Sequence, residues 1–298
     1  MIVTQFQRRR PADKFSMEGY FQRVRNELEG RVELSQFVPP YLSRGVFRRI
    51  VNTMSAARRQ TDVNHITGDI HYVAMGMRRS KTILTVHDCQ VLERLTGWKR
   101  WMVKTLWYTL PARKVTLITV NSEETKRQLL KTVRFPEERV VVVPVSVSEN
   151  FQPAPRTFNT DCPRILQVGT KSNKNLHRLA AALRGLRCHV DILGTLSAAD
   201  RMVLDVNQIE FTNYTELSDE DVVSRYVEAD IVCFASTYEG FGMPIVEAQK
   251  VERVCVTSNC SSMPEVAGDG AIFVDPFDVS SIRQGIDAAI SDLSLIHI

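Results

Sequence analysis

Short apolar or β-branched runs, each followed by a polar loop and a helical pattern, recur along the whole chain. In the first half the clearest runs are residues 1–6, 81–86, 115–120 and 140–143. In the second half they are residues 164–168, 188–193, 209–212, 231–235 and 253–257. Runs of this length bounded by turn residues predict buried strands, and strands that alternate with helices form parallel sheets covered on both faces. The sequence therefore predicts an α/β protein made of doubly wound units.

Charge and proline content divide the chain near its middle. Residues 1–150 carry 26 Lys and Arg against 14 Asp and Glu, whereas residues 151–298 carry 12 against 20. Pro153, Pro155 and Pro163 lie at this point, in a stretch with few apolar residues. Prolines outside the strand and helix patterns are typical of a linker. We therefore predict an N-terminal domain over 1–150, a linker over 151–163 and a C-terminal domain over 164–298.

The basic half predicts an anionic partner, which could be anionic lipid, a phosphate or nucleic acid, with a solvated basic face as the alternative. Residues 46–59 alternate apolar and basic groups at helical spacing, a pattern more typical of a helix packed on the core than of a membrane binder. Residues 97–114 interleave tryptophans with lysines and arginines, which indicates either an interfacial segment or a helix packed on a sheet. This segment is the best candidate for peripheral contact with an anionic membrane.

The spacing of the cysteines and the hydropathy pattern indicate the cellular compartment in which the protein is expected. No pair of the six cysteines has the spacing of a zinc site or a C-x-x-C redox site. No run approaches the roughly 20 apolar residues of a membrane-spanning helix, and Arg8, Arg9 and Arg10 interrupt the only early apolar stretch. We therefore expect a reduced, cytoplasmic protein whose membrane association, if it has one, is peripheral.

One stretch, residues 238–248, carries two carboxylates around a predicted helix start. Gly240 and Gly242 allow a tight turn after the strand at 231–235, and Pro244 is tolerated in the first helical turn. Glu239 then lies at the strand-to-helix turn, and Glu247 lies inside a helix expected over 243–250. Free N–H groups and the positive end of the helix dipole bind phosphate. This stretch therefore predicts a site for a phosphorylated sugar or polyol.

Two other strand ends carry polar candidates. The strand at 164–168 is followed by a Gly-led loop with Lys171 and Lys174 and then by a helix, a layout that cradles phosphate without matching a dinucleotide or ATP fingerprint. His87 and Asp88 follow the strand at 81–86, where ligands collect in open α/β sheets. His87 is either an acid, base or donor toward a substrate or a residue that satisfies a loop carbonyl.

With these pieces in order, the chain resembles the retaining glycosyltransferases of family 4, which have the GT-B fold. The matching residues are Val168-Gly169-Thr170, Asn173-Lys174-Asn175-Leu176, the Glu-x7-Glu pair Glu239 and Glu247, and the stretches 261–271 and 274–276. Residues 65–69, 85–88 and 122–126 match more loosely. The resemblance implies two Rossmann-like doubly wound domains that face a central cleft. It also implies a nucleoside-diphosphate sugar as donor, a glycan or lipid-linked acceptor, and transfer with retention in cell-surface polysaccharide synthesis. It implies no cofactor, no metal and no nucleic acid.

The resemblance also implies roles for particular residues. The implied catalytic residues are Glu239, His87 and Lys174. Glu239 would lie near the donor sugar, His87 of the first domain would also lie near that sugar, and Lys174 would pair with the donor diphosphate. Glu247 would bind the ribose hydroxyls. The implied donor-binding set is Gly169, Thr170, Lys171, Lys174, Asn213, Tyr214, Thr215, Phe241, Gly242, Met243 and Glu247, in which 213–215 would form a loop that contacts the base. The implied acceptor-side set is Gly68, Asp69 and Asp88.

The chain departs from the family pattern in three places. Thr170 stands where many members have an arginine, so Lys171 would have to supply that charge. The loop at residues 7–14 has arginines where many members have glycines. The apolar tail at 293–298 differs from the helices expected there, and we expect a truncated C-terminus. Two alternatives to a working transferase remain: a nucleotide-binding subunit with impaired catalysis, and a nucleotide-sugar epimerase, which the Glu-x7-Glu and Asn-Lys-Asn patterns favour less.

Overall fold

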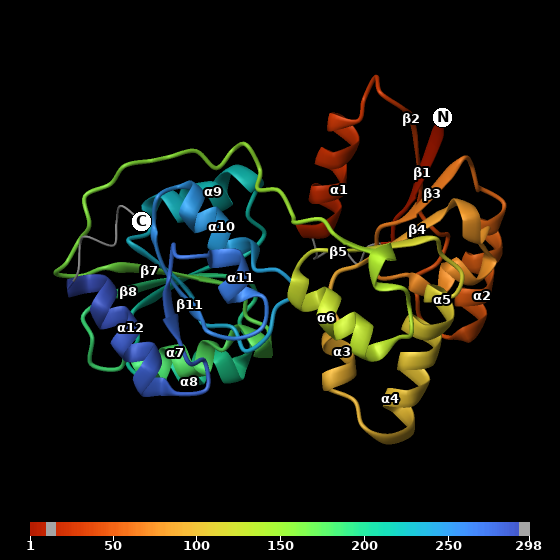
Figure 1. The fold of residues 1–298 in the computed structure, drawn as a ribbon. Coiled ribbons are helices and arrows are strands. Elements are labelled where there is room, and N and C mark those ends of the chain that lie inside the picture. Colours follow the sequence, from red (N-terminus) through yellow and green to blue (C-terminus); the bar gives the residue numbers. More distant parts are fainter. Residues whose placement is uncertain (10–15, 292–298) are drawn as a thin grey trace. The chain divides into compact units, whose positions relative to one another are not determined.

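The computed structural model describes residues 1–9 and 16–291 and consists of two compact units (Figure 1). Contacts divide the chain between Ser146 and Val147. Part of the arginine-rich loop predicted over 7–14 and the tail predicted over 293–298 lie outside the described residues.

The first unit is a parallel six-stranded sheet in the order β2-β1-β3-β4-β5-β6. Its strands are β1 (Ile2–Phe6), β2 (Glu33–Phe37), β3 (Val63–Ile66), β4 (Thr82–Val86), β5 (Leu117–Val120) and β6 (Val140–Val142). Its longer helices are α1 (Ser16–Glu27), α2 (Val46–Ala57) and α6 (Glu123–Thr132). The segment predicted as one helix over 97–114 consists of α4 (Gly97–Val103), the π-helical turn η3 (Lys104–Thr109) and α5 (Leu110–Ala112). Shorter pieces are η1 (His71–Gly76), η2 (Arg79–Lys81), α3 (Gln90–Glu93) and η4 (Glu137–Arg139).

The second unit is a parallel six-stranded sheet in the order β12-β11-β10-β7-β8-β9. Its strands are β7 (Arg164–Val168), β8 (His189–Leu193), β9 (Phe211–Tyr214), β10 (Ile231–Phe234), β11 (Val254–Ser258) and β12 (Ile272–Val274). Its helices are η5 (Ser172–Lys174), α7 (Leu176–Leu183), α8 (Ala198–Val206), α9 (Asp219–Glu228), α10 (Met243–Lys250), α11 (Met263–Ala267) and α12 (Val279–Ser291). The chain runs outward from β7 to β9, then returns to β10 on the other side of β7, which is the doubly wound order of a Rossmann-like domain. The α/β prediction is confirmed in both units.

The two faces of the second sheet bury different helices. Ile165, Ile231 and Val256 belong to one core cluster together with residues of α7, α8 and α12. Leu166, Val232 and Cys255 belong to the other, with residues of α9, α10 and α11. Successive strand side chains point to opposite faces, so strands that are apolar at every position are buried on both sides. Figure 1 shows the same two helical layers.

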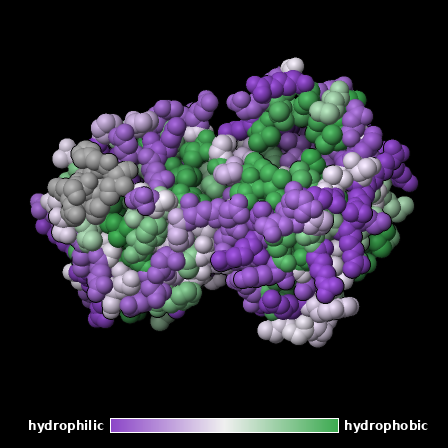
Figure 2. Space-filling model, viewed as in Figure 1, coloured by the Kyte–Doolittle hydropathy of each residue, from purple (hydrophilic) through white to green (hydrophobic). Residues whose placement is uncertain are grey.

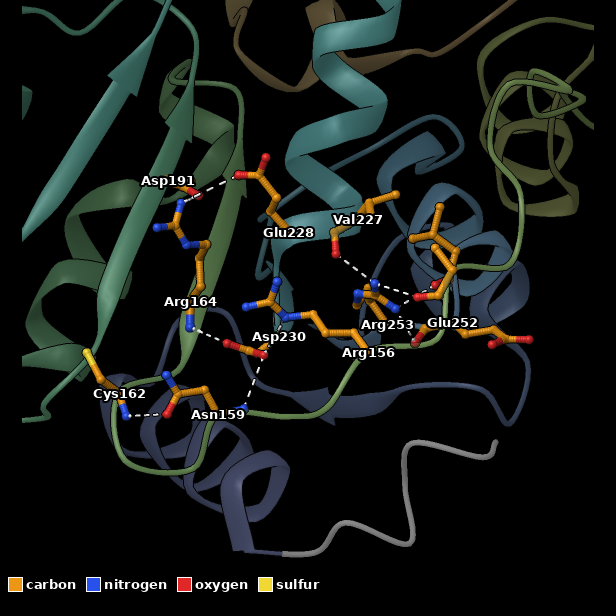
Figure 3. A network of polar contacts seen from close by, with 12 residues as sticks. Arg156, Asn159, Cys162, Arg164, Asp191, Val227, Glu228, Asp230, Glu252 and Arg253 are labelled. Atoms are coloured by element: carbon orange, nitrogen blue, oxygen red, sulfur yellow. Dashed lines mark hydrogen bonds and ion pairs between the residues drawn. The ribbon is translucent and has the colours of Figure 1, made fainter.

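Residues 151–163 contain no helix or strand and lie against the second unit. Figure 3 shows the polar network that holds this segment. Asp230, which is 3% exposed, accepts hydrogen bonds from Arg156 Nε at 3.1 Å, the Asn159 N–H at 3.3 Å and the Arg164 N–H at 2.8 Å. Arg253 donates to the carbonyls of Ala154 and Val227. Three groups of the segment, the Arg156 guanidinium, the Asn159 N–H and the Ala154 carbonyl, thus contact two buried charged residues.

The strand boundary that bears on the candidate site was predicted wrongly. The strand expected over 209–212 is β9, Phe211–Tyr214, so Asn213 and Tyr214 are strand residues and not part of a polar loop. Hydrogen bonds between β8 and β9 pair Ile192 with Asn213 and Leu193 with Tyr214. Polar side chains are compatible with a strand at the edge of a sheet, where one side faces water.

Candidate functional site

The second unit brings together two loops that are far apart in the sequence. The order of strands reverses between β7 and β10, and ligands of open α/β sheets bind outside the carboxyl ends of the strands at such a point. Residues 169–175 follow β7, and residues 235–242 follow β10. Thr237 N–H donates to the Asn173 carbonyl at 2.9 Å, which joins the two loops directly.

Lys174 and Glu239 form an ion pair across these loops. Lys174 Nζ lies 2.7 Å from Glu239 Oε1, and the two side chains are only 17% and 16% exposed. Asn173 Nδ2 donates to the same carboxylate oxygen and to the Tyr238 carbonyl, both at 3.1 Å. The Lys174 ammonium also lies 4.4 Å from the centre of the Phe234 ring. A cation and a carboxylate are therefore held at one spot that remains open to solvent.

The loop before Lys174 is shaped around its side chain. Gly169 has a φ of 89°, and a Cβ there would come within 3.1 Å of the Lys174 side chain. Gln167, which is buried, donates to the carbonyls of Gly169 and Lys174. Only glycine combines this backbone conformation with so close an approach. The need for Gly169 thus comes from packing against Lys174.

The start of α10 presents unpaired backbone donors. Gly242, at a φ of 119°, precedes the helix, and a Cβ there would lie 3.0 Å from the Ile245 side chain. The N–H groups of Phe241, Gly242 and Met243 have no acceptor among the residues that the structure describes. The first N–H groups of a helix, with the positive end of its dipole, form an anion-binding site. The predicted helix start and its bounds are confirmed.

Two serines that sequence reasoning left without a role hold the turn between Glu239 and α10. Ser261 Oγ donates to the Glu239 carbonyl at 2.6 Å and accepts from the Glu239 N–H at 3.2 Å. Ser262 Oγ donates to the carbonyls of Glu239 and Phe241 at 3.0 and 2.6 Å. Both follow β11, the neighbour of β10, so the third strand end also reaches this site. Their place in the family-like stretch 261–271 was the only sequence signal.

Glu247, in α10, is paired with a residue that sequence reasoning missed. The fully buried Tyr226 hydroxyl of α9 donates to the Glu247 carboxylate. Burial, together with the nearby Glu247 charge, raises the pKa of Tyr226 well above its usual value. Tyr226 therefore remains a hydrogen-bond donor at physiological pH and orients one carboxylate oxygen of Glu247.

Thr170 and Lys171 lie in the loop after β7 but differ in their surroundings. Thr170 Oγ1 donates to the Thr195 carbonyl at 2.7 Å, and its side chain lies 3.2 Å from where a Cβ of Gly194 would be. Lys171 is exposed, and its carbonyl accepts the Lys174 N–H at 2.7 Å. Thr170 therefore links the loops after β7 and β8, while the Lys171 side chain lies at the solvent boundary.

Asn213 and Tyr214 make contacts within the fold. Asn213 Nδ2 donates to the carbonyls of Ile192 and Gly194 at 3.1 and 2.7 Å. The Tyr214 hydroxyl accepts from Arg225 at 3.1 Å, and the Arg225 guanidinium stacks over the Tyr214 ring at 4.9 Å. Thr215 is exposed directly after the strand. The structure thus places these three residues at the end of β9 and assigns the Asn213 amide to the backbone.

In the first unit, His87 lies directly after β4. Its Nε2–H donates to the Thr67 carbonyl at 2.9 Å, and its ring packs edge-on against Phe21. Because a carbonyl only accepts, this bond assigns the proton of the neutral ring to Nε2. The buried Nδ1 has no hydrogen-bond partner among the described residues. Burial lowers the pKa of His87 to about 4, so at neutral pH Nδ1 is an acceptor.

The predicted acceptor-side residues flank His87 in the loops after β3 and β4. A Cβ on Gly68 would lie 3.0 Å from the Arg8 backbone nitrogen, so Gly68 permits close contact with the loop after β1. Asp69 accepts a hydrogen bond from Trp107 Nε1 at 3.0 Å. Asp88 accepts from the Gln90 N–H at 2.9 Å. These residues share the carboxyl edge of the sheet with His87.

Neither a metal cluster nor a membrane span is found in the part of the chain that the structure describes. No group of three or more His, Cys, Asp or Glu side chains there could hold a metal ion. None of the helices within residues 1–9 and 16–291 is long and apolar enough to cross a bilayer.

The fold and the strand-end loops define a class of proteins, the GT-B glycosyltransferases. The crystal structure of Anabaena Alr3699/HepE in complex with UDP and glucose has the same fold, with a TM-score of 0.74 and 13% identity over 98% of this chain and 91% of that one. The sequence profile described as Glycosyltransferase Family 4 matches residues 8–151, and the profile described as Glycosyl transferases group 1 matches residues 148–295. The chain therefore belongs to the family 4 type of glycosyltransferases.

Two curated relatives are mannosyltransferases. O-antigen chain mannosyltransferase B of Escherichia coli is 26% identical over 245 residues, which are 72% of this chain and 62% of that protein. The MMP alpha-(1->4)-mannosyltransferase of Mycolicibacterium hassiacum is 26% identical over 265 residues, 78% of this chain and 63% of that protein. The chain thus spans a little over three fifths of the length of these relatives.

Proposed function

We propose that this protein transfers a sugar from a nucleoside-diphosphate sugar to a glycan or lipid-linked glycan, with retention, in the synthesis of a cell-surface polysaccharide. The observation that carries the proposal is the ion pair of Lys174 with Glu239, 2.7 Å apart, which joins the loop after β7 to the loop that leads from the neighbouring strand β10 into the unpaired N–H groups of α10. Positive groups placed where charge develops on a leaving diphosphate accelerate its departure. The names of the two curated relatives support a mannosyl donor.

In the proposed reaction the bond between the anomeric carbon and the diphosphate oxygen breaks as the acceptor hydroxyl oxygen bonds to the same face of that carbon. The hydroxyl proton passes to the departing diphosphate. Lys174 and the α10 amides stabilise the diphosphate charge, and Glu239 faces the positive charge on the sugar. These groups act without a resident cofactor, and we expect turnover to survive a chelator.

Two further residues are assigned to binding. Glu247, oriented by Tyr226, accepts hydrogen bonds from the ribose hydroxyls. His87 accepts a hydrogen bond from a sugar hydroxyl at its unpaired Nδ1. The neutral ring is poorly suited to be a general acid because its pKa is about 4. Gly169, Phe241, Gly242 and Met243 contribute backbone, and the remaining predicted donor and acceptor residues stay predictions.

The test is transfer of radiolabel from UDP- and GDP-sugars, GDP-mannose among them, to a glycan or membrane-extract acceptor. Labelled glycan that needs Lys174 supports the proposal. Donor binding without transfer or hydrolysis would instead identify a nucleotide-binding subunit, and conversion of the free nucleotide sugar would identify an epimerase. None of the six cysteines forms a disulfide, as is usual in a reducing compartment, and we propose a cytoplasmic location for the reaction.

A further inference from the structure

The helix α4 exposes a stripe of large apolar side chains. No residue of α4 is buried, and Trp98 and Trp101 are each 68% exposed. Met102 of α4 and Leu106 of η3, which continues α4, are exposed as well, and the spacing of Trp98, Trp101 and Met102 places these three on one face of α4. Figure 2 shows pale and purple side chains at the lower end of the first unit, where Figure 1 places α4. Exposed tryptophans on one face of a basic helix are typical of a segment that lies in a membrane interface.

The helix α2 carries a second stripe of the same kind. Its exposed apolar side chains are Val46, Phe47, Ile50 and Met54, and Phe47 is 76% exposed. The prediction that this helix packs its apolar residues on the core is therefore wrong for these four. Arg49 of α2 stacks over the Trp107 ring at 4.6 Å, which joins α2 to the segment that continues α4. We call the eight exposed apolar side chains, four from α2, three from α4 and Leu106 from η3, the α2–α4 surface.

The sequence around both stripes contains basic residues and no acidic ones. Residues 94–114 contain six Lys and Arg and no Asp or Glu, and residues 41–61 contain five Arg and no Asp or Glu. A solvated basic helix does not need exposed tryptophan and phenylalanine, so solvation alone leaves the stripes unexplained. The combination of apolar stripe and cations calls for a partner that is both negatively charged and able to bury hydrocarbon.

We propose that the α2–α4 surface docks on an anionic lipid bilayer, with Trp98 and Trp101 at the level of the headgroups. A second copy of the chain is disfavoured as occupant because a symmetric contact would bring the same cations together. The bases of a nucleic acid stack on aromatic rings, but a nucleic acid would not bury the aliphatic side chains of Ile50, Met54 and Leu106. A bilayer takes up all of these side chains, and its surface charge attracts each nearby Lys or Arg by about 1 kcal/mol. The proposal is independent of donor chemistry.

The test is sedimentation of the full chain with vesicles of neutral lipid and with vesicles in which part of the lipid is phosphatidylglycerol. Wild type should bind only the anionic vesicles, and added salt should weaken binding. Trp98→Ser/Trp101→Ser should reduce the partition coefficient by about tenfold or more, and Phe47→Ser/Ile50→Ser should also reduce it. Because all four side chains are exposed, the thermal midpoint should not change.

The matched control is Met202→Ser/Val206→Ser, which removes exposed apolar side chains from α8 of the second unit. It should bind vesicles as wild type does. Absence of binding to anionic vesicles, or an equal loss in the control, would overturn the proposal. So would a concentration-dependent dimer that the tryptophan variant abolishes without any vesicle binding. Nucleoside-diphosphate affinity without vesicles should be unchanged in all variants, so failure here is distinct from failure of the proposed transfer reaction.

Discussion

Removing either partner of the Lys174–Glu239 pair tests the centre of the candidate site. Glu239 Oε1 accepts from Lys174 at 2.7 Å and from Asn173 at 3.1 Å, and both charged side chains are mostly buried. Lys174→Met removes the charged donor and leaves Asn173 to donate to this carboxylate oxygen. Glu239→Gln keeps the shape of the side chain but removes the charge that faces the ammonium.

The expected loss of stability follows from these contacts. A hydrogen bond to a charged group contributes about 1.5–3 kcal/mol net, and the remaining solvent access reduces this to about 1–3 kcal/mol for either variant. For a unit of this size 1 kcal/mol shifts the midpoint of thermal unfolding by about 2–4 °C. The double variant should lose less than the sum of the single variants, with a coupling of about 1–3 kcal/mol. Scanning calorimetry of the full chain measures all four proteins.

Binding of a nucleoside diphosphate separates this structural role from a role in donor binding. If Lys174 binds the diphosphate, the ligand competes with Glu239 for the ammonium. Lys174→Met should then weaken binding by about tenfold or more, whereas Glu239→Gln should strengthen it by up to about tenfold. Titration calorimetry with UDP and GDP gives both values. A Glu239→Gln variant with unchanged midpoint and weakened diphosphate binding would refute the reasoning.

Three other substitutions have defined outcomes. Tyr226→Phe removes the hydrogen bond to Glu247 and should weaken diphosphate-sugar binding by about threefold to thirtyfold through loss of orientation, measured by titration calorimetry; unchanged affinity would exclude Glu247 from the ribose role or Tyr226 from orienting it. His87 has a folded pKa of about 4, below its unfolded value of about 6.5, so the stability it contributes is complete above pH 6.5 and falls as pH drops toward 4. His87→Asn should make unfolding less pH-dependent in that window, and an unaltered pH dependence would contradict the assignment. Asp230→Asn should lower stability by about 1–3 kcal/mol, while the exposed Asp205→Asn should not; equal midpoints for the two variants would show that the network in Figure 3 is not needed.

Most of the fold could be predicted because its sheets are buried on both faces. The strand at 231–234 consists of Ile, Val, Cys and Phe, and all four residues are buried. Such a run has no solvent side, so it indicates a parallel sheet covered by helices even without knowledge of its neighbours. The edge strand β2, Glu33–Phe37, was not predicted, because its Glu, Ser and Gln side chains are compatible with exposed edge positions and resemble a loop.

The order of strands explains why residues 174 and 239 could be grouped only by family resemblance. Sixty-five positions separate Lys174 from Glu239, and the local sequence of neither loop predicts a contact with the other loop. They meet because β10 pairs with β7 and not with β9, its predecessor in the chain. That pairing depends on the packing of the whole sheet, which periodicity within a single segment does not encode.

The roles of polar loop residues were still harder to predict from the sequence, since the same side chain can bind a ligand or form hydrogen bonds with the backbone. Asn213 and Asn173 are both amides near strand ends, yet Asn213 donates only to the carbonyls of Ile192 and Gly194 among the described residues, whereas Asn173 donates both to the Tyr238 carbonyl and to the Glu239 carboxylate. Each buried carbonyl requires a donor, and the loop nearest to it supplies one. Which amide is left for a ligand therefore depends on which carbonyls the neighbouring strand leaves unpaired. For Asn213 that requirement comes from the end of β8, so its amide nitrogen is bonded to the backbone, whereas Thr215, directly after the strand, is exposed.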